Sequence, residues 1–461
     1  MDRRDFLRRV GLAGAGVSSG LTSLARPARA QAASGEPRPN VLFIFTDDQP
    51  PHTIYQMSRT LARFAGGLNL TETGYVPVPL CGPARASFFT GVYPHTHRVL
   101  LNEHPLAYDV YRQRGYPTVD IFPRMRAAGY RLGFFGKFIN GYGEVESGNR
   151  WVHPAFRSGR VRWAALADKQ GHISYMVNTN GNLHDEVQNH TPYFGKEAEA
   201  FILNSVPVAP WFCYLPWTDP HVPYTPRFPH THDGARYTSP GVREEDITDK
   251  TYPQTSRRAG PAYQQEHYEG ILEELVAVDR WVERLFLALE HSGQLDNTIV
   301  IFSSDNGYML GEHGGMTQKG HPYEESARIP FLIRGPGISA STAPESPLVS
   351  HLDITATILA AAGADMSGID GRDLRDLGSS SGAWRKRLLV EHPGKGWRMV
   401  RDGRWIYMDL MGETVEMYDL ALDPYQLENR AGEGLIIEQE LATRLASLRS
   451  ATGDALRAAE E

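Results

Sequence analysis

The chain has 461 residues, of which 41% are hydrophobic and 10% aromatic. A chain of this length and composition can bury a large core, which excludes a disordered or fibrous protein, and we expect one large domain with a smaller one. Its formal net charge is −7, and six arginines and two aspartates lie within the first thirty residues, so the chain without them carries −11. This acidic balance argues against a nucleic-acid partner.

The first thirty residues have the pattern of an export signal. Residues 2–8 read DRRDFLR, which fits the twin-arginine consensus, and a weakly apolar run at 10–24 and an Ala28-Arg29-Ala30 cleavage site follow. A basic tail and an anchoring helix are the alternatives, but the run is too short and too rich in glycine and serine to span a bilayer. We predict that residues 1–30 are a signal peptide for the twin-arginine export machinery. The mature protein is then periplasmic or secreted, without stable membrane insertion.

Only two cysteines, Cys81 and Cys213, occur in the chain. An exported protein of this size with so few cysteines does not depend on a disulfide framework for its stability. If Cys81 is chemically converted, Cys213 has no partner.

Short apolar segments followed by polar residues predict the central sheet. Residues 41–46 are continuously apolar and β-prone, as expected of a strand covered on both faces, and the pattern recurs at 131–135, 211–215 and 298–302. The clearest helical pattern between them runs from about 266 to 291. This alternation predicts an α/β domain over residues 36–370, with a large doubly wound, mostly parallel sheet flanked by helices. Loops beyond the carboxyl ends of such strands converge, so polar residues there can meet in one crevice.

The last ninety or so residues have a different pattern. Short strand-like segments occur around 397–400, 405–408 and 415–418, and a helical pattern runs from about 436 to 458. We predict a smaller C-terminal α+β subdomain over residues 371–461.

The most specific local signal is the segment LCGPARAS at residues 80–87. Pro83 suits the first turn of a helix, because the amide hydrogen it lacks would have no partner there. Cys81 is then placed at the positive end of that helix, where an anion is favoured. Arg85 lies about one turn further along, near enough to hold an oxygen at residue 81. The arrangement suits a group that handles an oxyanion.

The motif CGPAR resembles the C-x-P-x-R motif of the formylglycine-dependent (type I) sulfatases, which belong to the alkaline phosphatase superfamily. A five-residue match can arise by chance, and a lone cysteine can be a small buried hydrophobe. The remaining sulfatase motifs, however, occur in this chain in the family order. The resemblance implies that a formylglycine-generating enzyme oxidises Cys81 to formylglycine, and that the hydrate of this aldehyde attacks the sulfur of a sulfate ester.

Four oxygen-bearing side chains follow two of the predicted strands: Asp47 and Asp48 after the first, and Asp305 and Asn306 after a later one. Such hard donors are ligands for calcium or magnesium rather than zinc. Alone, an Asp-Asp pair at a strand end is more often a turn or a helix cap. The resemblance implies that these four residues, with the converted Cys81, bind the metal, and we expect Ca²⁺ ahead of Mg²⁺.

Three further residues match the sulfate-binding side chains of the family: Lys137 in GKF, His221 in DPHVPY and Lys319 in QKGHPY. Each alone would be an ordinary solvated lysine or a satisfied histidine. The resemblance makes either His221 or Lys319 the proton donor to the departing alkoxide, and places Arg85 and Lys137 beside the nucleophile.

Two more positions are candidates for a supporting role behind the site. Many sulfatases carry a histidine two or three residues after the first lysine, where this chain has Ile139 and Asn140, so the role of that histidine does not carry over. His313 in LGEHG matches a recurrent sulfatase stretch and is expected at least to shape its loop.

The substrate expected from the resemblance is a sulfated small molecule or glycan, with 6-O-sulfated glucosamine favoured. GKFINGY, SDNGY, YDL and DPYQLEN, at residues 136–142, 304–308, 418–420 and 423–429, resemble the N-acetylglucosamine-6-sulfatase and heparan 6-O-endosulfatase branch.

Loops at residues 140–150, 184–194 and 225–253 are the expected walls of the substrate pocket. They contain or border aromatic residues that would suit stacking on a sugar ring, although such residues are as often merely packed. These residues are Tyr142, Trp151, Tyr193, Tyr224 and Tyr237.

Two rival functions stay open from the sequence. Phosphonate and phosphate ester hydrolases of the same superfamily share the fold, and some of them use formylglycine. A catalytically silent glycan-binding protein is the second rival, because a fold alone does not establish activity. The intact set of Cys81, Arg85 and the four oxygen donors speaks against a silent protein.

Overall fold

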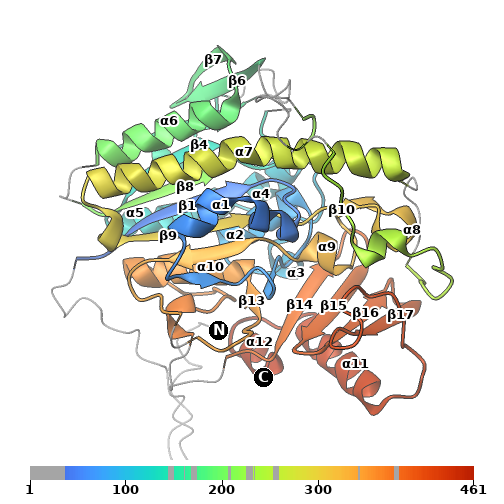
Figure 1. Cartoon of the computed structure of the whole chain (residues 1–461). Coiled ribbons are helices and arrows are strands. Elements are labelled where there is room, and N and C mark those ends of the chain that lie inside the picture. The colour runs from blue at the N-terminus through green and yellow to red at the C-terminus, as the bar shows by residue number, and fades with distance from the viewer. Residues whose placement is uncertain are drawn as a thin grey trace, which may run out of the picture. The chain divides into compact units, whose positions relative to one another are not determined.

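A computed structural model describes residues 37–143, 150–159, 161–167, 174–205, 209–224, 232, 234–252, 259–340, 343–377 and 384–461. Residues Pro37–Glu461 form one compact unit (Figure 1). The expected signal peptide lies outside the described residues. No helix in the described ranges has both the length and the apolar character that crossing a membrane requires.

A mixed sheet with a parallel centre forms the core of this unit. Strands β9, β1, β8, β4 and β5 run parallel, while β12, β2, β6 and β7 add antiparallel edges. In spatial order the nine strands of the described residues are β2 (Leu68–Asn69), β12 (Phe331–Arg334), β9 (Thr298–Ser304), β1 (Asn40–Thr46), β8 (Trp211–Pro216), β4 (Arg131–Gly136), β5 (Arg162–Leu166), β6 (Ser174–Thr179) and β7 (Asn182–Val187). The predicted α/β class is confirmed.

Both faces of the sheet are buried, which explains why its central strands are continuously apolar rather than alternating. Val41, Phe43 and Phe45 of β1 point into one core, and Leu42 and Ile44 point into the other. The helices of the first core are α2 (Cys81–Thr90), α4 (Ala107–Gln113), α5 (Ile121–Ala127) and α10 (His351–Ala362), and those of the second are α1 (Ser58–Arg63), α6 (His190–Leu203) and α7 (Pro261–His291) (Figure 1).

A four-stranded antiparallel sheet follows in the C-terminal part. It consists of β14 (Arg387–His392), β15 (Trp397–Asp402), β16 (Trp405–Leu410) and β17 (Thr414–Asp419), with α11 (Ile436–Leu448) packed against it. The single helix expected at 436–458 is wrong, because α11 ends before a break and α12 (Gly453–Ala459) starts after Thr452. The expected α+β character is confirmed, and the boundary at residue 371 stays a prediction.

Several short elements complete the unit. They are α3 (Pro94–His97), the hairpin of β10 (Met309–Leu310) and β11 (Thr317–Gln318), α8 (Glu312–Gly315), α9 (Glu324–Ala327), and the pair β3 (Gly74–Tyr75) and β13 (Val349–Ser350). Residues 184–194, expected to be a loop, instead form the end of β7 and the start of α6.

Candidate active site

The carboxyl ends of β1 and β9 bring four oxygen-bearing side chains together. Thr46 and Ser304 are paired in the parallel register, so the residues that follow them are neighbours in space. The amide of Asp305 donates to Thr46 O at 3.1 Å, and the amide of Asp48 donates to Asp305 Oδ1 at 3.2 Å. Two residues 257 positions apart in the chain are thereby fixed by the sheet itself.

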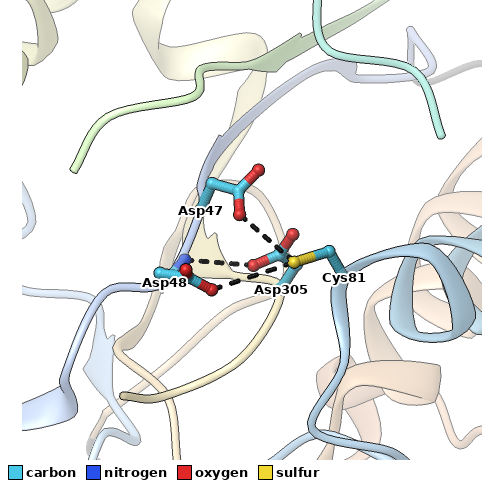
Figure 2. Close-up of side chains that lie close together, drawn as sticks. All are labelled: Asp47, Asp48, Cys81 and Asp305. Carbon is cyan, nitrogen blue, oxygen red and sulfur yellow. Dashed lines mark hydrogen bonds between the residues drawn. The ribbon is translucent and has the colours of Figure 1, made fainter. Parts of the chain in front are cut away.

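Cys81 is the first residue of α2 and lies beside this cluster (Figure 2). Its thiol donates to Asp47 Oδ1 at 3.4 Å and is 3.8 Å from Asp48 Oδ1. Ligand atoms of Asp47, Asp48, Cys81 and Asp305 all lie within 4.8 Å of one another, and all four residues are buried. The sequence prediction of a helix start at Cys81 therefore matches the structure.

The chemistry of the cluster fits a divalent cation with a preference for oxygen. Three carboxylates converge on one point, as Ca²⁺ and Mg²⁺ require. Asn306 Nδ2 donates to Asp48 Oδ1 at 2.7 Å, while Asn306 Oδ1 is buried and has no hydrogen-bond partner among the described residues. A buried carbonyl oxygen without a donor is costly unless a ligand meets it. The orphaned Oδ1 thus completes a set of four candidate metal ligands.

Arg85 ties the cluster to its surroundings. Its side chain is fully buried, with Nε donating to Asp305 Oδ2 at 2.9 Å and a terminal nitrogen donating to Asp47 Oδ2 at 3.1 Å. The other terminal nitrogen donates to the backbone carbonyl of Lys137 at 2.9 Å. A rigid guanidinium fork that reaches two carboxylates fixes their orientation in a way that a lysine could not.

Three further cationic or titratable side chains reach the carboxylates from loops far apart in sequence. Lys137 Nζ pairs with Asp47 Oδ2, Lys319 Nζ pairs with Asp48 Oδ2, and His221 Nε2 is 3.4 Å from Asp48 Oδ2. Lys137 is placed by a close approach of β4 to β8: Gly136, at φ 137°, lies where a Cβ would be 1.9 Å from Pro216 O. The five side chains predicted to act in catalysis therefore meet at one point.

Burial and neighbouring charges set the protonation of the cluster. Burial, together with the charge of Asp47, raises the pKa of Asp305 to about 7. Burial alone would also raise the pKa of Asp47, but the charges of Lys137 and Arg85 hold it below its ordinary value. Burial, and then the carboxylates of Asp305 and Asp47, raise the pKa of the Cys81 thiol well above its usual range. The unmodified thiol is therefore neutral.

A cavity of about 420 Å³ opens beside the cluster, within the usual range for a small-molecule site. Asp47, Lys137, His221 and Asn140 are among the residues that line it. The rest of its wall consists of Asn102, Glu103, Phe138, Ile139, Gly141, Tyr142, Gly143, Leu166, His190, Thr218, Val222 and Pro223. An ester that enters this cavity reaches the acidic cluster directly.

The structure gives contacts within the protein for four of the aromatic residues expected to border the substrate pocket. Tyr142 borders the cavity, but it is 2% exposed and its hydroxyl donates to Trp151 O at 2.6 Å. Tyr193 belongs to α6, Tyr224 bonds to His267 Nδ1 at 2.9 Å, and the ring of Tyr237 stacks on His52. The ring of Tyr142 is therefore not open to a sugar, whereas Trp151, Tyr193, Tyr224 and Tyr237 are only partly buried, and their stacking on a sugar ring stays a prediction.

The two supporting candidates occupy different places. Asn140 lines the cavity, and its buried Oδ1 has no hydrogen-bond partner among the described residues. His313 is fully buried and contacts Glu244 and Glu325 rather than the cluster.

Sequence reasoning missed residues that support Cys81 and the cavity. Asn102 Oδ1 accepts the amide of Gly82 at 2.8 Å, which satisfies one of the free amides at the start of α2. His190 and Thr218 line the cavity and bond to each other at 2.5 Å. None of them belongs to a motif, and only their spatial convergence on the cavity reveals them.

Two family profiles match the chain. The profile described as Sulfatase matches residues 39–364, and the profile described as N-sulphoglucosamine sulphohydrolase, C-terminal, matches residues 311–451.

Similar proteins of known description include two animal sulfatases and one solved structure. The human N-acetylglucosamine-6-sulfatase is 30% identical over 79% of this chain and 69% of its own length. The Drosophila melanogaster extracellular sulfatase SULF-1 homolog is 30% identical over 78% of this chain, which spans only 33% of that protein. A structure described as a complex with its substrate D-glucosamine-2-N,6-O-disulfate superimposes with a TM-score of 0.68 and 20% identity, covering 90% of this chain and 98% of the other. At that identity the structural likeness establishes the fold alone.

Proposed function

The chain belongs to the sulfatase family and is a sulfuric ester hydrolase, and from that premise we propose that it is an exported, formylglycine-dependent enzyme that releases 6-O-sulfate from glucosamine residues of a carbohydrate. The observation that carries the proposal is the buried cluster in which Cys81 meets Asp47, Asp48 and Asp305, beside a cavity that Asp47 lines. The motif around Cys81 supports its conversion by a formylglycine-generating enzyme.

The residues of the cluster have different roles in the proposed reaction. A calcium ion held by Asp47, Asp48, Asp305 and Asn306 would withdraw charge from a sulfate oxygen, and formylglycine at position 81 would supply the oxygen nucleophile. Arg85 holds two of the carboxylates in place, and the ammonium groups of Lys137 and Lys319 lie where sulfate oxygens become more negative during reaction.

The departing alkoxide needs a proton, and His221 and Lys319 are the two nearby donors. Both contact Asp48 Oδ2, but of the two only His221 is among the described residues that line the cavity. The ring nitrogen Nδ1 of His221 bonds to the carbonyl of Val222 at 2.5 Å, which leaves Nε2 facing the carboxylate cluster. Because the hydrogen on Nδ1 is donated to the Val222 carbonyl, Nε2 can give a proton only from the doubly protonated ring, which the neighbouring Asp48 carboxylate favours. We therefore assign proton donation to Nε2 of the His221 imidazolium and the binding of a sulfate oxygen to Lys319.

The choice of a 6-O-sulfated amino sugar rests on the relatives and on the character of the cavity. One relative is described as an N-acetylglucosamine-6-sulfatase. The cavity offers amide, hydroxyl and carboxyl groups from Asn102, Glu103, Asn140 and Thr218 beyond the cluster. Such groups suit the hydroxyls of a sugar better than an apolar aryl ring.

A substrate panel tests this choice. We expect the enzyme, produced with an activating partner and confirmed to carry formylglycine, to release sulfate from N-acetylglucosamine 6-sulfate with a kcat/KM at least about 10-fold above that for 3-O-sulfated and galactose 6-sulfate isomers. A factor of ten corresponds to about 1.4 kcal/mol of differential transition-state binding, which one or two hydrogen bonds in a pocket supply. Ion chromatography of free sulfate measures it.

The panel includes an aryl sulfate and a phosphonate monoester as rivals, with the Cys81→Ala variant as the blank. Robust turnover of the aryl sulfate with none of any 6-O-sulfated amino sugar would overturn the substrate assignment and leave the sulfatase family membership intact. Faster turnover of the phosphonate than of every sulfate ester would favour the rival hydrolase.

Export by the twin-arginine route is tested in the intact precursor. That route carries folded proteins, so conversion of Cys81 is expected before export. Replacing both Arg3 and Arg4 by lysine should retain active, aldehyde-bearing enzyme in the cytoplasm, whereas the same change at Arg8 and Arg9 leaves the twin-arginine pair intact and should permit export. Fractionation with an activity assay measures it, and unchanged export of the first variant would refute the signal assignment.

A further inference from the structure

The loop that carries Lys319 is closed on itself by one buried histidine. His313 Nδ1 is 2.8 Å from Glu244 Oε2, and its Nε2 is 3.5 Å from Glu325 Oε2. Its ring also stacks on Tyr323, with centroids 4.2 Å apart. These contacts join the two ends of residues 313–325, here called the 313–325 loop, and Lys319 lies at its midpoint.

The loop needs such side-chain contacts for its stability, because parts of its backbone are in unfavourable conformations. His313 and Gln318 both have positive φ, at 52° and 73°, in the left-handed region that non-glycine residues rarely adopt. The hairpin of β10 and β11, which encloses His313, has only two residue pairs. Local structure alone therefore does not hold Lys319 in place, and side-chain contacts must do so.

The charged groups at the contact of His313 with Glu244 and Glu325 are complementary and buried. His313 is fully buried, and although burial alone would lower its pKa, the hydrogen bond to Glu244 and the nearby carboxylate of Glu325 raise it to about 9. Glu244 is also paired with Lys250, at 2.7 Å. An imidazolium between two carboxylates is strongly directional, and its loss would leave buried charge unpaired.

The other side of Lys319 is held by the C-terminal sheet. The carbonyl of Gly320 accepts hydrogen bonds from Lys395 Nζ at 3.1 Å and from Trp397 Nε1 at 3.2 Å, and the amide of Gly320 donates to Ser326 Oγ at 3.0 Å. Lys319 is thus clamped from both sides, and its ammonium group reaches Asp48. On the N-terminal side of Lys319, the contacts of His313 hold the loop.

We propose that His313 is a positioning residue for Lys319: by bridging Glu244 and Glu325 it closes the 313–325 loop and sets the ammonium group of Lys319 against Asp48. This inference rests on the proposed role of Lys319 in binding a sulfate oxygen. His313 touches neither the substrate cavity nor the cluster in the described residues, so it acts through the loop and is not itself a catalytic residue.

The test is a double-mutant cycle on the full mature enzyme, with rates expressed per formylglycine. His313→Ala is expected to lower kcat/KM about 10- to 100-fold, because a displaced charge no longer meets the transition state. Lys319→Ala is expected to lower it about 100- to 1,000-fold. In the Lys319→Ala background, His313→Ala should lower it by less than about 3-fold, since the group that it positions is gone.

Two companion variants keep the result interpretable if His313→Ala folds poorly. Asparagine tolerates positive φ and can still donate to Glu244, so His313→Asn should recover part of the activity. Glu325→Gln removes the charge at the other end of the bridge. Its effect on kcat/KM should likewise be large with Lys319 present and small in the Lys319→Ala background.

His153 provides the matched control, because it is also fully buried and pairs with a carboxylate, Asp120, at 2.8 Å. His153→Ala should lower the melting temperature and combine additively with Lys319→Ala. Equal losses from His313→Ala in both backgrounds, or unchanged kcat/KM, would overturn the positioning role. Full activity of Lys319→Ala alone would instead refute the proposed role of Lys319, and with it the function assigned to the bridge.

Discussion

Replacing Cys81 by alanine is expected to reduce kcat by on the order of 10⁴-fold or more, to the level of the blank, because no other side chain in the cluster can take over as nucleophile. The lysines and Arg85 are paired with carboxylates, and these carboxylates are the proposed metal ligands. The fold should survive, since Cys81 is a small side chain at a helix terminus. Sulfate release and thermal unfolding measure the two effects separately.

Cys213 offers a matched control for the loss of a buried thiol. It lies in β8 within the core, so Cys213→Ala should cost about 1 kcal/mol of stability through the small cavity it leaves, with activity per folded molecule retained. Peptide mapping of the active enzyme should find an aldehyde or its hydrate at residue 81 and an unmodified thiol at residue 213. Full activity in protein that carries only unmodified Cys81 would contradict the formylglycine proposal.

Removal of divalent metal is expected to abolish activity, and Ca²⁺ is expected to restore it. Asn306→Ala removes the buried Oδ1 that has no other partner, so it should weaken Ca²⁺ binding by about 10- to 100-fold or more. Ca²⁺ at about 100 times its Kd stabilises the folded protein by about 2.7 kcal/mol, and the resulting rise in Tm reports binding without any activity assay. Asn306→Ala should lack that rise at the same Ca²⁺ concentration.

Asn297, which precedes the opposite end of β9, supplies the control. Its amide donates to Arg38 O at 3.4 Å, far along the strand from the cluster, so Asn297→Ala should keep the Ca²⁺-dependent rise in Tm. Mg²⁺ titrated in parallel tests the choice of ion. A chelated enzyme with full activity, and the same Tm with and without Ca²⁺, would exclude the metal site.

The predictions from sequence succeeded where burial leaves a clear pattern. Residues 41–45 of β1 are all apolar because both faces of the strand are covered, and the polar residues after β1 and β9 meet because parallel strands end at one edge. Strand β7 was missed, since its residues NLHDEV are exposed or only partly buried and carry no apolar alternation. The break between α11 and α12 was missed because the helical periodicity continues on both sides of it.

The contacts behind the site were beyond sequence reasoning for a different reason. The bridge from His313 to Glu244 spans 69 residues, and Glu244 comes from an irregular segment with no periodic pattern. Asn102 supports α2 from a loop that has no motif. Motifs identify the side chains that contact the reacting group. The residues that support those side chains depend on local packing, which only the folded chain reveals.

Cys213 is buried in β8, the central strand of the sheet, and its reactivity can therefore report local unfolding of that sheet. Cys213 faces the core between β1 and β4 in register with Leu42 and Gly133, has no exposed surface, and has a pKa raised by burial. Once residue 81 is an aldehyde, the sulfur of Cys213 is the sole thiol in the chain. A thiol-reactive dye can reach it only after β8 separates from a helix layer or a neighbouring strand, so the labelling rate under native conditions reports the free energy of that opening. This measurement requires no engineered cysteine, and it reports the opening of the sheet to which the cluster is attached rather than the motion of the loops around the cluster.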